Sequence, residues 1–348
     1  MKNILITGGT GYIGSHTSLA LLKRGFNLTI IDSNINSSQL SINRIKRILK
    51  NDYLEEKIFF FKGDIRDKKF LDQIFFNAKK QKNPIQGVIH FAGLKAVSES
   101  LFKPLLYWEN NVYGSICLFE IMRKYDCKNI VFSSSASIYN NNSLKPILET
   151  SEIKPITPYG QTKVAVENIL EGIFRTSRNS WRIANLRYFN PIGAHESGLI
   201  GENPLATPNN LFPIVCRVAD GSISELQIFG SDWSTNDGTP IRDFIHIMDL
   251  AEAHCAGLDF LFKNKPQFIN LNVGTGVGTS VLELVNKFME VNNCKIPYKY
   301  SPKRLGDSPF VVADNTKITS TLEWCPKRNI EQMCIDGWKW QRSNPYGF

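Results

Sequence analysis

The chain has 348 residues and carries 41 Lys and Arg against 32 Asp and Glu, a formal charge of +9. That length is enough for about two domains of ~150 residues, and a hydrophobic content of 42% excludes disorder for the bulk of the chain. No stretch approaches the ~20 apolar residues of a membrane-spanning helix. Seven scattered cysteines without a Cys-x-x-Cys pair favour a reduced compartment. We therefore expect a cytoplasmic protein without a membrane partner.

Short strand-like runs alternate with amphipathic helical stretches through the first half of the chain. Strands are predicted over residues 3–7, 28–32, 57–62, 87–91, 129–133 and 181–188. Parallel neighbouring strands need a crossover connection between them. The alternation therefore predicts an α/β fold with a doubly wound parallel sheet, which binds ligands beyond the carboxyl ends of its strands.

From about residue 190 the sequence changes to loops rich in Pro, Gly and Asn, with shorter periodic pieces. This texture predicts a smaller, mixed α/β C-terminal domain that binds the substrate. We expect one domain over residues 1–190 and the second over 191–348. The strand-like run 268–274 and the helical residues after it lead us to expect that part of 241–290 returns to the first domain.

A glycine-rich turn follows the first predicted strand: Gly8-Gly9-Thr10-Gly11-Tyr12-Ile13-Gly14. Glycines permit a tight turn and a close approach to pyrophosphate, and the following helix offers free N–H donors to the anion. Asp32 ends the second strand 18 residues beyond Gly14, where an acid hydrogen-bonds the adenosine ribose and repels a 2′-phosphate. The pattern predicts NAD rather than NADP; the alternative is a purely structural turn.

A second candidate site is Tyr159-Gly160-Gln161-Thr162-Lys163, preceded by Ser133-Ser134-Ser135. Tyr159 and Lys163 are four residues apart at the start of a predicted helix, so both project from one face. A neighbouring ammonium, together with the positive charge of an oxidised nicotinamide, favours the phenolate, which makes Tyr159 a candidate acid and base, with Lys163 as its electrostatic partner. Ser135 supplies a hydroxyl that can hold or relay the proton. The alternative is an ordinary surface pair.

With these motifs the chain resembles the extended short-chain dehydrogenase/reductases, and among them the UDP-glucose 4-epimerases, from the first strand to the tail. Further resembling stretches are Lys62-Gly63-Asp64-Ile65-Arg66, residues 90–97, Glu109-Asn110-Asn111-Val112, residues 186–191, Pro208-Asn209-Asn210-Leu211, residues 242–250, Arg304-Leu305-Gly306-Asp307 and Trp338-Lys339-Trp340-Gln341. The resemblance implies tightly bound NAD, a UDP-sugar substrate and a homodimer paired through the helices that contain Asn110 and Tyr159.

The resemblance also implies roles for individual residues. The catalytic group is Ser135, Tyr159 and Lys163. Those three also belong to the NAD site, whose other members are Gly8, Gly11, Tyr12, Ile13, Gly14, Asp32, Asn36, Ser37, Asp64, Ile65, Phe91, Ala92, Gly93, Lys95, Asn110, Tyr188 and Phe189. The UDP-sugar site comprises Lys95, Ser135, Tyr159, Asn190, Asn210, Leu211, Phe229, Arg242, Arg304, Asp307 and Val311. Guanidinium groups suit diphosphate oxygens, but Phe229 has an alternative place in the core and Asp307 an alternative role in orienting Arg304.

The family reaction is NAD-dependent 4-epimerisation of UDP-hexoses through a 4-keto intermediate, with Tyr159 exchanging the proton. Val311 stands where the family faces the sugar 2-substituent, so its small side chain predicts that N-acetylated UDP-sugars are also accepted. A nucleotide-sugar 4,6-dehydratase needs a carboxylate pair after the active-site serine, but Ser135-Ala136-Ser137 offers none.

Two non-enzymatic alternatives are a non-catalytic NAD-sensing protein and a nucleic-acid-binding protein. The presence of Tyr159 and Lys163 disfavours the first. The basic run 44–50 has the pattern of an ordinary solvated helix face, which disfavours the second. The five histidines show no metal-ligand spacing, so no metal site is predicted.

Overall fold

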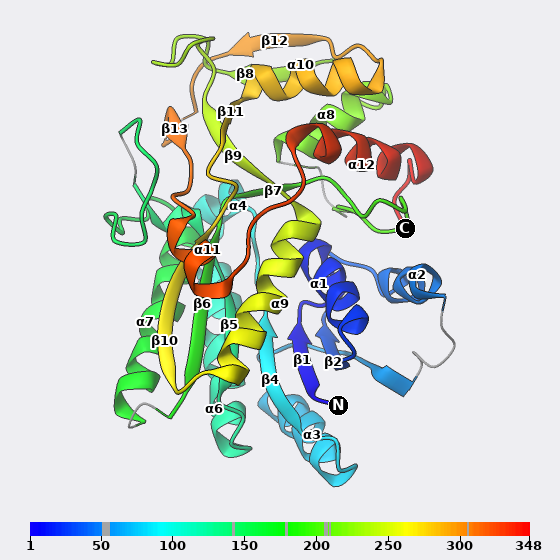
Figure 1. The fold of residues 1–348 in the computed structure, drawn as a ribbon. Coiled ribbons are helices and arrows are strands. Elements are labelled where there is room, and N and C mark those ends of the chain that lie inside the picture. The colour runs from blue at the N-terminus through cyan, green and yellow to red at the C-terminus, as the bar shows by residue number, and fades with distance from the viewer. Residues whose placement is uncertain (51–55, 141–142, 178–179, 205–207, 209, 305) are drawn as a thin grey trace.

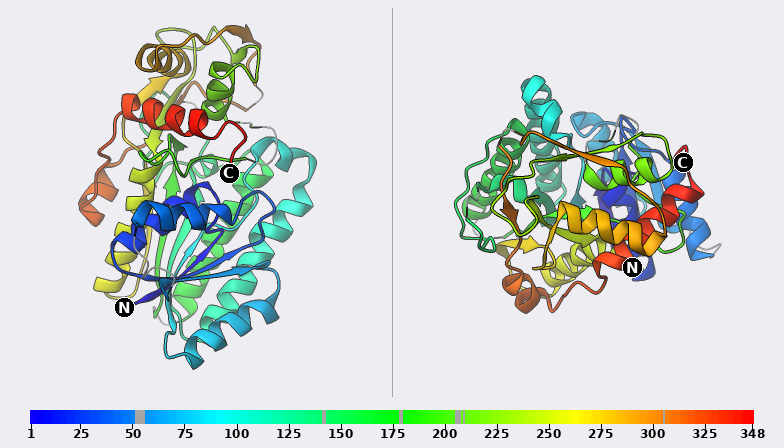
Figure 2. Two further views of the ribbon diagram at one scale, coloured as in Figure 1. Left: turned by 90° about the vertical axis from the view of Figure 1, so that its right-hand side faces the viewer. Right: turned by 90° about the horizontal axis from the view of Figure 1, so that it is seen from above.

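A computed structural model describes residues 1–50, 56–140, 143–177, 180–204, 208, 210–304 and 306–348. Of the motif residues named above, Asn209 and Leu305 lie outside this described part. The larger part of the molecule is a seven-stranded sheet, and the smaller part stacks above the carboxyl ends of its strands (Figures 1 and 2).

The sheet has the strand order β10-β6-β5-β4-β1-β2-β3, and all neighbours are parallel. Its strands are β1 (Asn3–Thr7), β2 (Asn27–Asp32), β3 (Ile58–Lys62), β4 (Ile85–His90), β5 (Asn129–Ser135), β6 (Arg182–Tyr188) and β10 (Gln267–Val273). The predicted doubly wound α/β sheet is confirmed. Its seventh strand comes from the C-terminal half of the chain, since β10 pairs with β6 along its whole length.

Helices cover both faces of the sheet, as its doubly buried apolar strands require. On one face lie α1 (Tyr12–Lys23), α2 (Leu40–Leu49), α9 (Ile247–Lys263) and α11 (Thr316–Leu322). On the other lie α3 (Lys68–Lys80), α6 (Gly114–Lys124) and α7 (Pro158–Thr176). Between β4 and α6 run the short helices α4 (Val97–Phe102) and α5 (Pro104–Tyr107), followed by a π-helical segment, Trp108–Tyr113. Ile45 of α2 is fully buried in the apolar core beneath α1 and α9, whereas Arg47 and Lys50 are exposed, so the basic run 44–50 belongs to an amphipathic helix.

The smaller part has its own apolar core beneath α8 (Leu211–Ala219), α10 (Val281–Asn292) and α12 (Ile330–Ser343). Strand β9 (Ile241–His246) pairs with β7 (Asn190–Ile192), β11 (Gly278–Ser280) and β13 (Phe310–Val311). A separate pair joins β8 (Leu226–Phe229) to β12 (Tyr298–Ser301). The segment entering α10 is fixed by a capping box, because Ser280 and Glu283 satisfy each other's backbone N–H groups.

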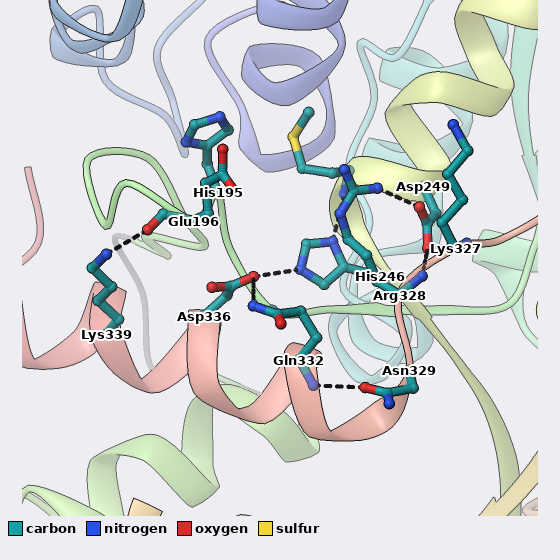
Figure 3. Close-up of polar contacts among 12 residues, drawn as sticks. His195, Glu196, His246, Asp249, Lys327, Arg328, Asn329, Gln332, Asp336 and Lys339 are labelled. Carbon is teal, nitrogen blue, oxygen red and sulfur yellow. Dashed lines mark hydrogen bonds and ion pairs between the residues drawn. The ribbon is translucent and has the colours of Figure 1, made fainter. Parts of the chain in front are cut away.

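A buried polar cluster ties α12 to the junction of β9 and α9 (Figure 3). His246 Nδ1 accepts the N–H of Met248 at 3.0 Å, so its Nε2 donates to Asp336 at 3.2 Å. Asp249, fully buried in the first turn of α9, accepts the N–H groups of Lys327 and Arg328 and pairs with the Arg328 guanidinium. These contacts satisfy buried charges internally and fasten the end of the chain to the main sheet.

We predict that the protein loses stability steeply in mild acid. Burial lowers the pKa of His16 and His90 to about 3 and that of His195 and His254 to about 4. The unfolded chain binds these protons near pH ~6.5, so stability is full above that pH and is lost as the pH falls toward the folded-state values. Each histidine contributes a slope of up to about 1.4 kcal/mol per pH unit. Chemical denaturation at pH 7.5, 6.0 and 5.0 measures the free energy of unfolding at each pH. His254→Leu should flatten its dependence on pH. A free energy of unfolding that is constant across this range contradicts the prediction.

Candidate active site

The predicted glycine turn joins β1 to α1 and forms a cradle that larger residues would fill. Gly8 has a φ of +69°, and a Cβ there would lie 2.8 Å from the Ala92 backbone nitrogen. A Cβ on Gly14 would lie 2.2 Å from the Gly8 carbonyl oxygen. Gly11 caps α1 without a side-chain hydrogen bond, and no acidic residue occupies the first turn. The N-terminus of α1 therefore offers unshielded N–H dipoles to an anion.

Asp32, at the end of β2, is held in a fixed orientation beside this turn. Its Oδ2 accepts the Thr10 N–H at 3.1 Å, and its Oδ1 accepts the Asn34 N–H at 2.9 Å and the Ser37 hydroxyl at 2.8 Å. A carboxylate fixed in this way can accept the hydroxyls of a ribose. Sequence reasoning selected Asp32 and Ser37 but missed Thr10 and Asn34, because their contributions become visible only once the turn is folded.

The turn and Asp32 open into a cleft of about 1300 Å³, part of which is open to solvent. The cleft is lined by 18 residues predicted from sequence: Gly8, Gly11, Tyr12, Ile13, Gly14, Asp32, Asn36, Ser37, Asp64, Ile65, Phe91, Ala92, Gly93, Lys95, Asn110, Tyr159, Lys163 and Tyr188. Ser135 and Phe189 are not among its lining residues. Residues 201–204 and Phe348 line it as well, although nothing in the sequence marked them.

Two of the lining residues are fixed by neighbours. Arg66 grips the Asp64 carboxylate through Nε at 3.1 and 3.0 Å and Nη2 at 2.6 Å, and this contact holds the pKa of Asp64 below its ordinary value. Asn110 donates its side-chain amide to the Leu106 carbonyl at 2.8 Å. Its neighbour Asn111, which sequence reasoning did not select, is the buried residue of this pair.

Asn111 supports the wall of the cleft. Its Oδ1 accepts the Leu94 N–H at 2.8 Å, and its Nδ2 donates to the Leu94 carbonyl at 3.0 Å and to Thr162 Oγ1 at 3.1 Å. It therefore links the loop that carries Lys95 to the helix that carries Tyr159.

Tyr159 and Lys163 lie buried in the first turns of α7, which Thr157 caps by accepting the Gly160 N–H at 3.2 Å. Lys163 Nζ lies 5.7 Å from the centre of the Tyr159 ring and donates to the Ser133 carbonyl at 2.7 Å. Ser133 shares a hydrogen bond of 2.8 Å with Tyr188. Tyr159 and Lys163 both line the cleft, so the alternative that they form an ordinary surface pair is wrong.

Burial dominates the electrostatics of this pair. Burial raises the pKa of Tyr159, although a hydrogen bond from Ser135 opposes the shift. Burial lowers the pKa of Lys163 to about 8, and Glu167 opposes that shift. In the chain by itself, the ammonium therefore does not make the phenol acidic; additional positive charge in the cleft is needed.

Helix α7 is clamped to the sheet directly below this pair. Glu167 and Arg187 of β6 form an ion pair at 2.6 Å with side chains 5% and 2% exposed. Ser134 donates to Glu167 at 2.5 Å, and Arg187 donates to the Tyr139 hydroxyl at 2.8 Å. Because every partner is satisfied, the clamp holds the helix in one register on the sheet.

Of the residues predicted to hold the UDP-sugar, Lys95 and Tyr159 line the cleft and Ser135 ends β5, whereas the others that the structure describes belong to the segments after β6. The Arg304 guanidinium lies 3.7 Å from the centre of the Phe229 ring. Arg242 of β9 donates to the Ile241 and Ser308 carbonyls at 2.9 Å and lies 3.5 Å from Asp307. Asp307 therefore orients Arg242. The alternative role predicted for Asp307 was to orient Arg304 instead.

The remaining predicted substrate residues occupy the edges of the same region. Val311 of β13 stands beside Arg242 of β9 in the strand register and packs with Phe189 in a small apolar cluster. Asn190 begins β7, and Leu211 packs on the smaller core. Asn210 caps α8 without a side-chain bond to that helix.

The cleft fits a dinucleotide by three independent features: a glycine cradle that side chains would fill, an uncapped helix N-terminus and a fixed ribose-accepting carboxylate. Among the described residues, no cluster of His, Cys, Asp or Glu could hold a metal ion, and no helix is long and apolar enough to cross a membrane.

Comparison with known proteins gives the same result. Residues 5–336 match the sequence model of the family described as GDP-mannose 4,6 dehydratase. UDP-glucose 4-epimerase 2 of Arabidopsis thaliana is 46% identical over 347 residues, covering 100% of this chain and 97% of that protein. UDP-glucose 4-epimerase of Bacillus subtilis (strain 168) is 45% identical over 345 residues, covering 99% of this chain and 98% of that protein.

Among solved structures, the UDP-glucose 4-epimerase of Stenotrophomonas maltophila, with bound NAD and formylated UDP-arabinopyranose, superposes with a TM-score of 0.93 at 41% identity, covering 99% of each chain. The parallel sheet, the glycine turn and the buried Tyr159 and Lys163 place the chain in the extended short-chain dehydrogenase/reductase class, which the matching family model represents. Within that class, the chain belongs to the family of UDP-glucose 4-epimerases.

Gly14→Ala should abolish retention of a bound dinucleotide. The added methyl would stand 2.2 Å from the Gly8 carbonyl oxygen, so the turn must open. Chromatographic assay of nucleotide released from the purified, denatured protein measures the effect. Gly172→Ala is the matched control, because that α7 glycine has nothing within 4 Å of an added Cβ and alanine favours the helix by about 1 kcal/mol. If Gly14→Ala releases as much nucleotide as the wild type, the cradle does not bind the pyrophosphate.

Proposed function

We propose that this protein interconverts UDP-galactose and UDP-glucose by inverting C4 of the sugar, with NAD held tightly in the cleft. The observation that carries the proposal is the placement of buried Tyr159 and Lys163 in a cleft lined also by the glycine turn and Lys95. Support comes from relatives of that name and from the Bifidobacterium longum UDP-glucose 4-epimerase, solved with NAD⁺ and UDP, at 40% identity, a TM-score of 0.92 and complete coverage of both chains.

In this proposal the NAD site comprises the 18 lining residues predicted from sequence. Ser135 and Phe189 adjoin it from the end of β5 and from the apolar cluster that contains Val311. NAD held there would supply reversible hydride transfer at C4 of the sugar, and its oxidised form would add positive charge near Tyr159.

The chain's own residues manage the proton and the position of the sugar. Tyr159 Oη removes the proton of the sugar 4-hydroxyl and later returns it, while Ser135 hydrogen-bonds the reacting oxygen. Lys163 keeps positive charge near the phenolate, which burial alone disfavours. The 4-keto sugar turns about its phosphate linkage and presents its other face, while Arg242 and Arg304 hold the diphosphate.

The absence of a carboxylate in Ser135-Ala136-Ser137 sets this protein apart from a 4,6-dehydratase, although the matching family model carries that description. We assign NAD binding to residues 1–190 and UDP-sugar binding to 191–348, with the segment containing β9, α9 and β10 shared between the two. The sites of the two ligands then meet at the carboxyl ends of the strands.

We further propose a homodimer formed through α6, α7 and the helices before them. Helices α4 and α5, which pack against α7, expose apolar side chains, among them Phe102 at 84% and Leu105 at 82%, which is unusual for a surface facing water. A hollow between α6 and α7 is lined by Phe119, Ile169 and Trp181. A charged surface of the same size would be stable in water, whereas this apolar surface is stabilised when a second copy of the chain covers it.

Tyr159→Phe should lower kcat by about 10²- to 10⁴-fold, because the residue loses its exchangeable proton and keeps its packing. The assay follows conversion of UDP-galactose to UDP-glucose by purified protein without added NAD. Tyr346→Phe is the control, since that side chain is 100% exposed. If wild-type protein contains no NAD(H) and does not interconvert the two sugars, the proposed function is wrong.

Val311→Tyr should lower kcat/KM for UDP-N-acetylgalactosamine by about tenfold or more and spare UDP-galactose, because the larger ring fills the space for the 2-substituent. We propose that the wild type accepts both classes. One similar protein, the UDP-Glc/GlcNAc 4-epimerase of Campylobacter jejuni, is 32% identical with a TM-score of 0.82 over 99% of this chain and 100% of that chain. Val311→Ala controls for loss of packing in the apolar cluster. A wild type inert toward N-acetylated sugars would refute the volume argument.

Sedimentation equilibrium should give twice the chain mass for the wild type and the chain mass for Phe102→Glu/Leu105→Glu, because charged residues cannot be buried unpaired at the proposed interface. Phe76→Glu, on exposed α3, is the control and should leave the mass unchanged. A monomeric wild type at micromolar concentration contradicts the homodimer.

A further inference from the structure

Glu202 lies at the point where the two halves of the molecule meet. It lines the cleft, its side chain is only 11% exposed, and neither the sequence motifs nor the proposed reaction gives it a role. A nearly buried carboxylate in a cleft that must receive two diphosphates is costly by itself, because it repels anionic ligands. Its partners show how this charge is used.

One oxygen of Glu202 accepts hydrogen bonds from both halves. Lys95 Nζ, from the loop after β4, donates to Oε1 at 2.9 Å. Asn210 Nδ2, from the N-cap of α8, donates to the same oxygen at 3.3 Å. Because Asn210 gives no side-chain bond to its own helix, its amide is directed toward Glu202. The carboxylate thus aligns two residues that the proposed function assigns to the UDP-sugar.

The backbone around Glu202 is anchored from behind. Its carbonyl accepts the Trp340 Nε1–H at 3.1 Å, and the Trp340 ring packs so closely on Gly201 that a Cβ there would lie 2.4 Å from the ring. Trp340 is itself buried on α12. The carboxylate is therefore held on the body of the smaller part.

The charge of Glu202 also acts on Lys95. Burial lowers the pKa of Lys95, but the carboxylate outweighs burial and the net effect is a raised pKa. The ammonium therefore stays charged at neutral and mildly basic pH while it lies near the cleft. A lysine has three donors, so the bond to Glu202 leaves others available for phosphate oxygens.

Resting on the proposed function, we propose that Glu202 is a positioning residue for the nucleotide: it holds Lys95 and Asn210 in place across the cleft so that both meet the UDP diphosphate without reorganisation. The residue does not touch the reacting atoms. Its loss should therefore weaken ground-state binding of UDP and leave the chemical step largely intact.

The test is isothermal titration of UDP into the purified holoenzyme, together with steady-state kinetics. Glu202→Gln keeps the size of the side chain and removes its charge, so Kd for UDP and KM for UDP-galactose should each rise about tenfold while kcat changes less than about threefold. Glu202→Asp should restore part of the affinity. Glu196→Gln, an exposed acid in the same segment, should match the wild type.

Two further readouts separate positioning from mere support of the fold. When Lys95 is already replaced by Met, adding Glu202→Gln should raise Kd for UDP little further, because the main partner of Glu202 is already gone. The affinity of Glu202→Gln for UDP should also decline at a lower pH than that of the wild type, since Lys95 then loses its proton earlier.

The outcomes are distinct from those that test the proposed function. Wild-type protein that neither binds UDP nor epimerises UDP-galactose defeats the proposed function itself. Active wild type with unchanged UDP affinity in Glu202→Gln, or an undiminished effect of that substitution in the Lys95→Met background, overturns the role of Glu202 alone. Should Glu202→Gln not fold, Glu202→Asp, which keeps the charge and shortens its reach, tests the same contacts: Kd for UDP should rise by a smaller factor, and an unchanged Kd would overturn the role of Glu202.

Discussion

The buried ion pair between Glu167 and Arg187 is the interaction on which the rest of the site depends. Two charges with side chains 5% and 2% exposed are stable only if their remaining donors and acceptors are satisfied, and Ser134 and Tyr139 complete the network. Because Glu167 lies one turn beyond Lys163 on α7, this pair fixes the rotation of the helix. The position of Tyr159 in the cleft follows from that rotation.

The same burial creates the main electrostatic demand of the site. Tyr159 must release a proton in a place where desolvation raises the pKa of its phenol, and Lys163 is itself discharged more easily there because its pKa falls to about 8. The phenolate is therefore favoured only when additional positive charge enters the cleft, such as that of an oxidised nicotinamide.

Much of the fold was predictable because it depends on local pattern. The predicted strands 3–7 and 28–32, the glycine turn and Asp32 are fixed by apolar runs and by steric needs that only glycine meets, and the structure has each of them where expected. Tyr159 and Lys163 followed from helical spacing. That β10 completes the sheet was expected, since its sequence is also strand-like.

What the sequence could not show are contacts between distant segments. Asp307 pairs with Arg242 rather than Arg304, Glu202 meets Lys95 across 107 positions, and Phe348 reaches the cleft from the other end of the chain. No local rule encodes such partners, because they depend on how α12 and β9 pack. The burial of Tyr159 could not be predicted for a related reason: spacing showed the ammonium, but only the folded chain shows how completely the phenol is buried and that burial raises its pKa.

The proposed mechanism requires hydride to leave and return to the same sugar carbon without exchange with water. Conversion of UDP-galactose deuterated at C4, followed by mass spectrometry and NMR of the product, measures this. UDP-glucose should retain the deuterium at C4, with none released to solvent. Protium from water at C4 of the product would show that the mechanism is wrong.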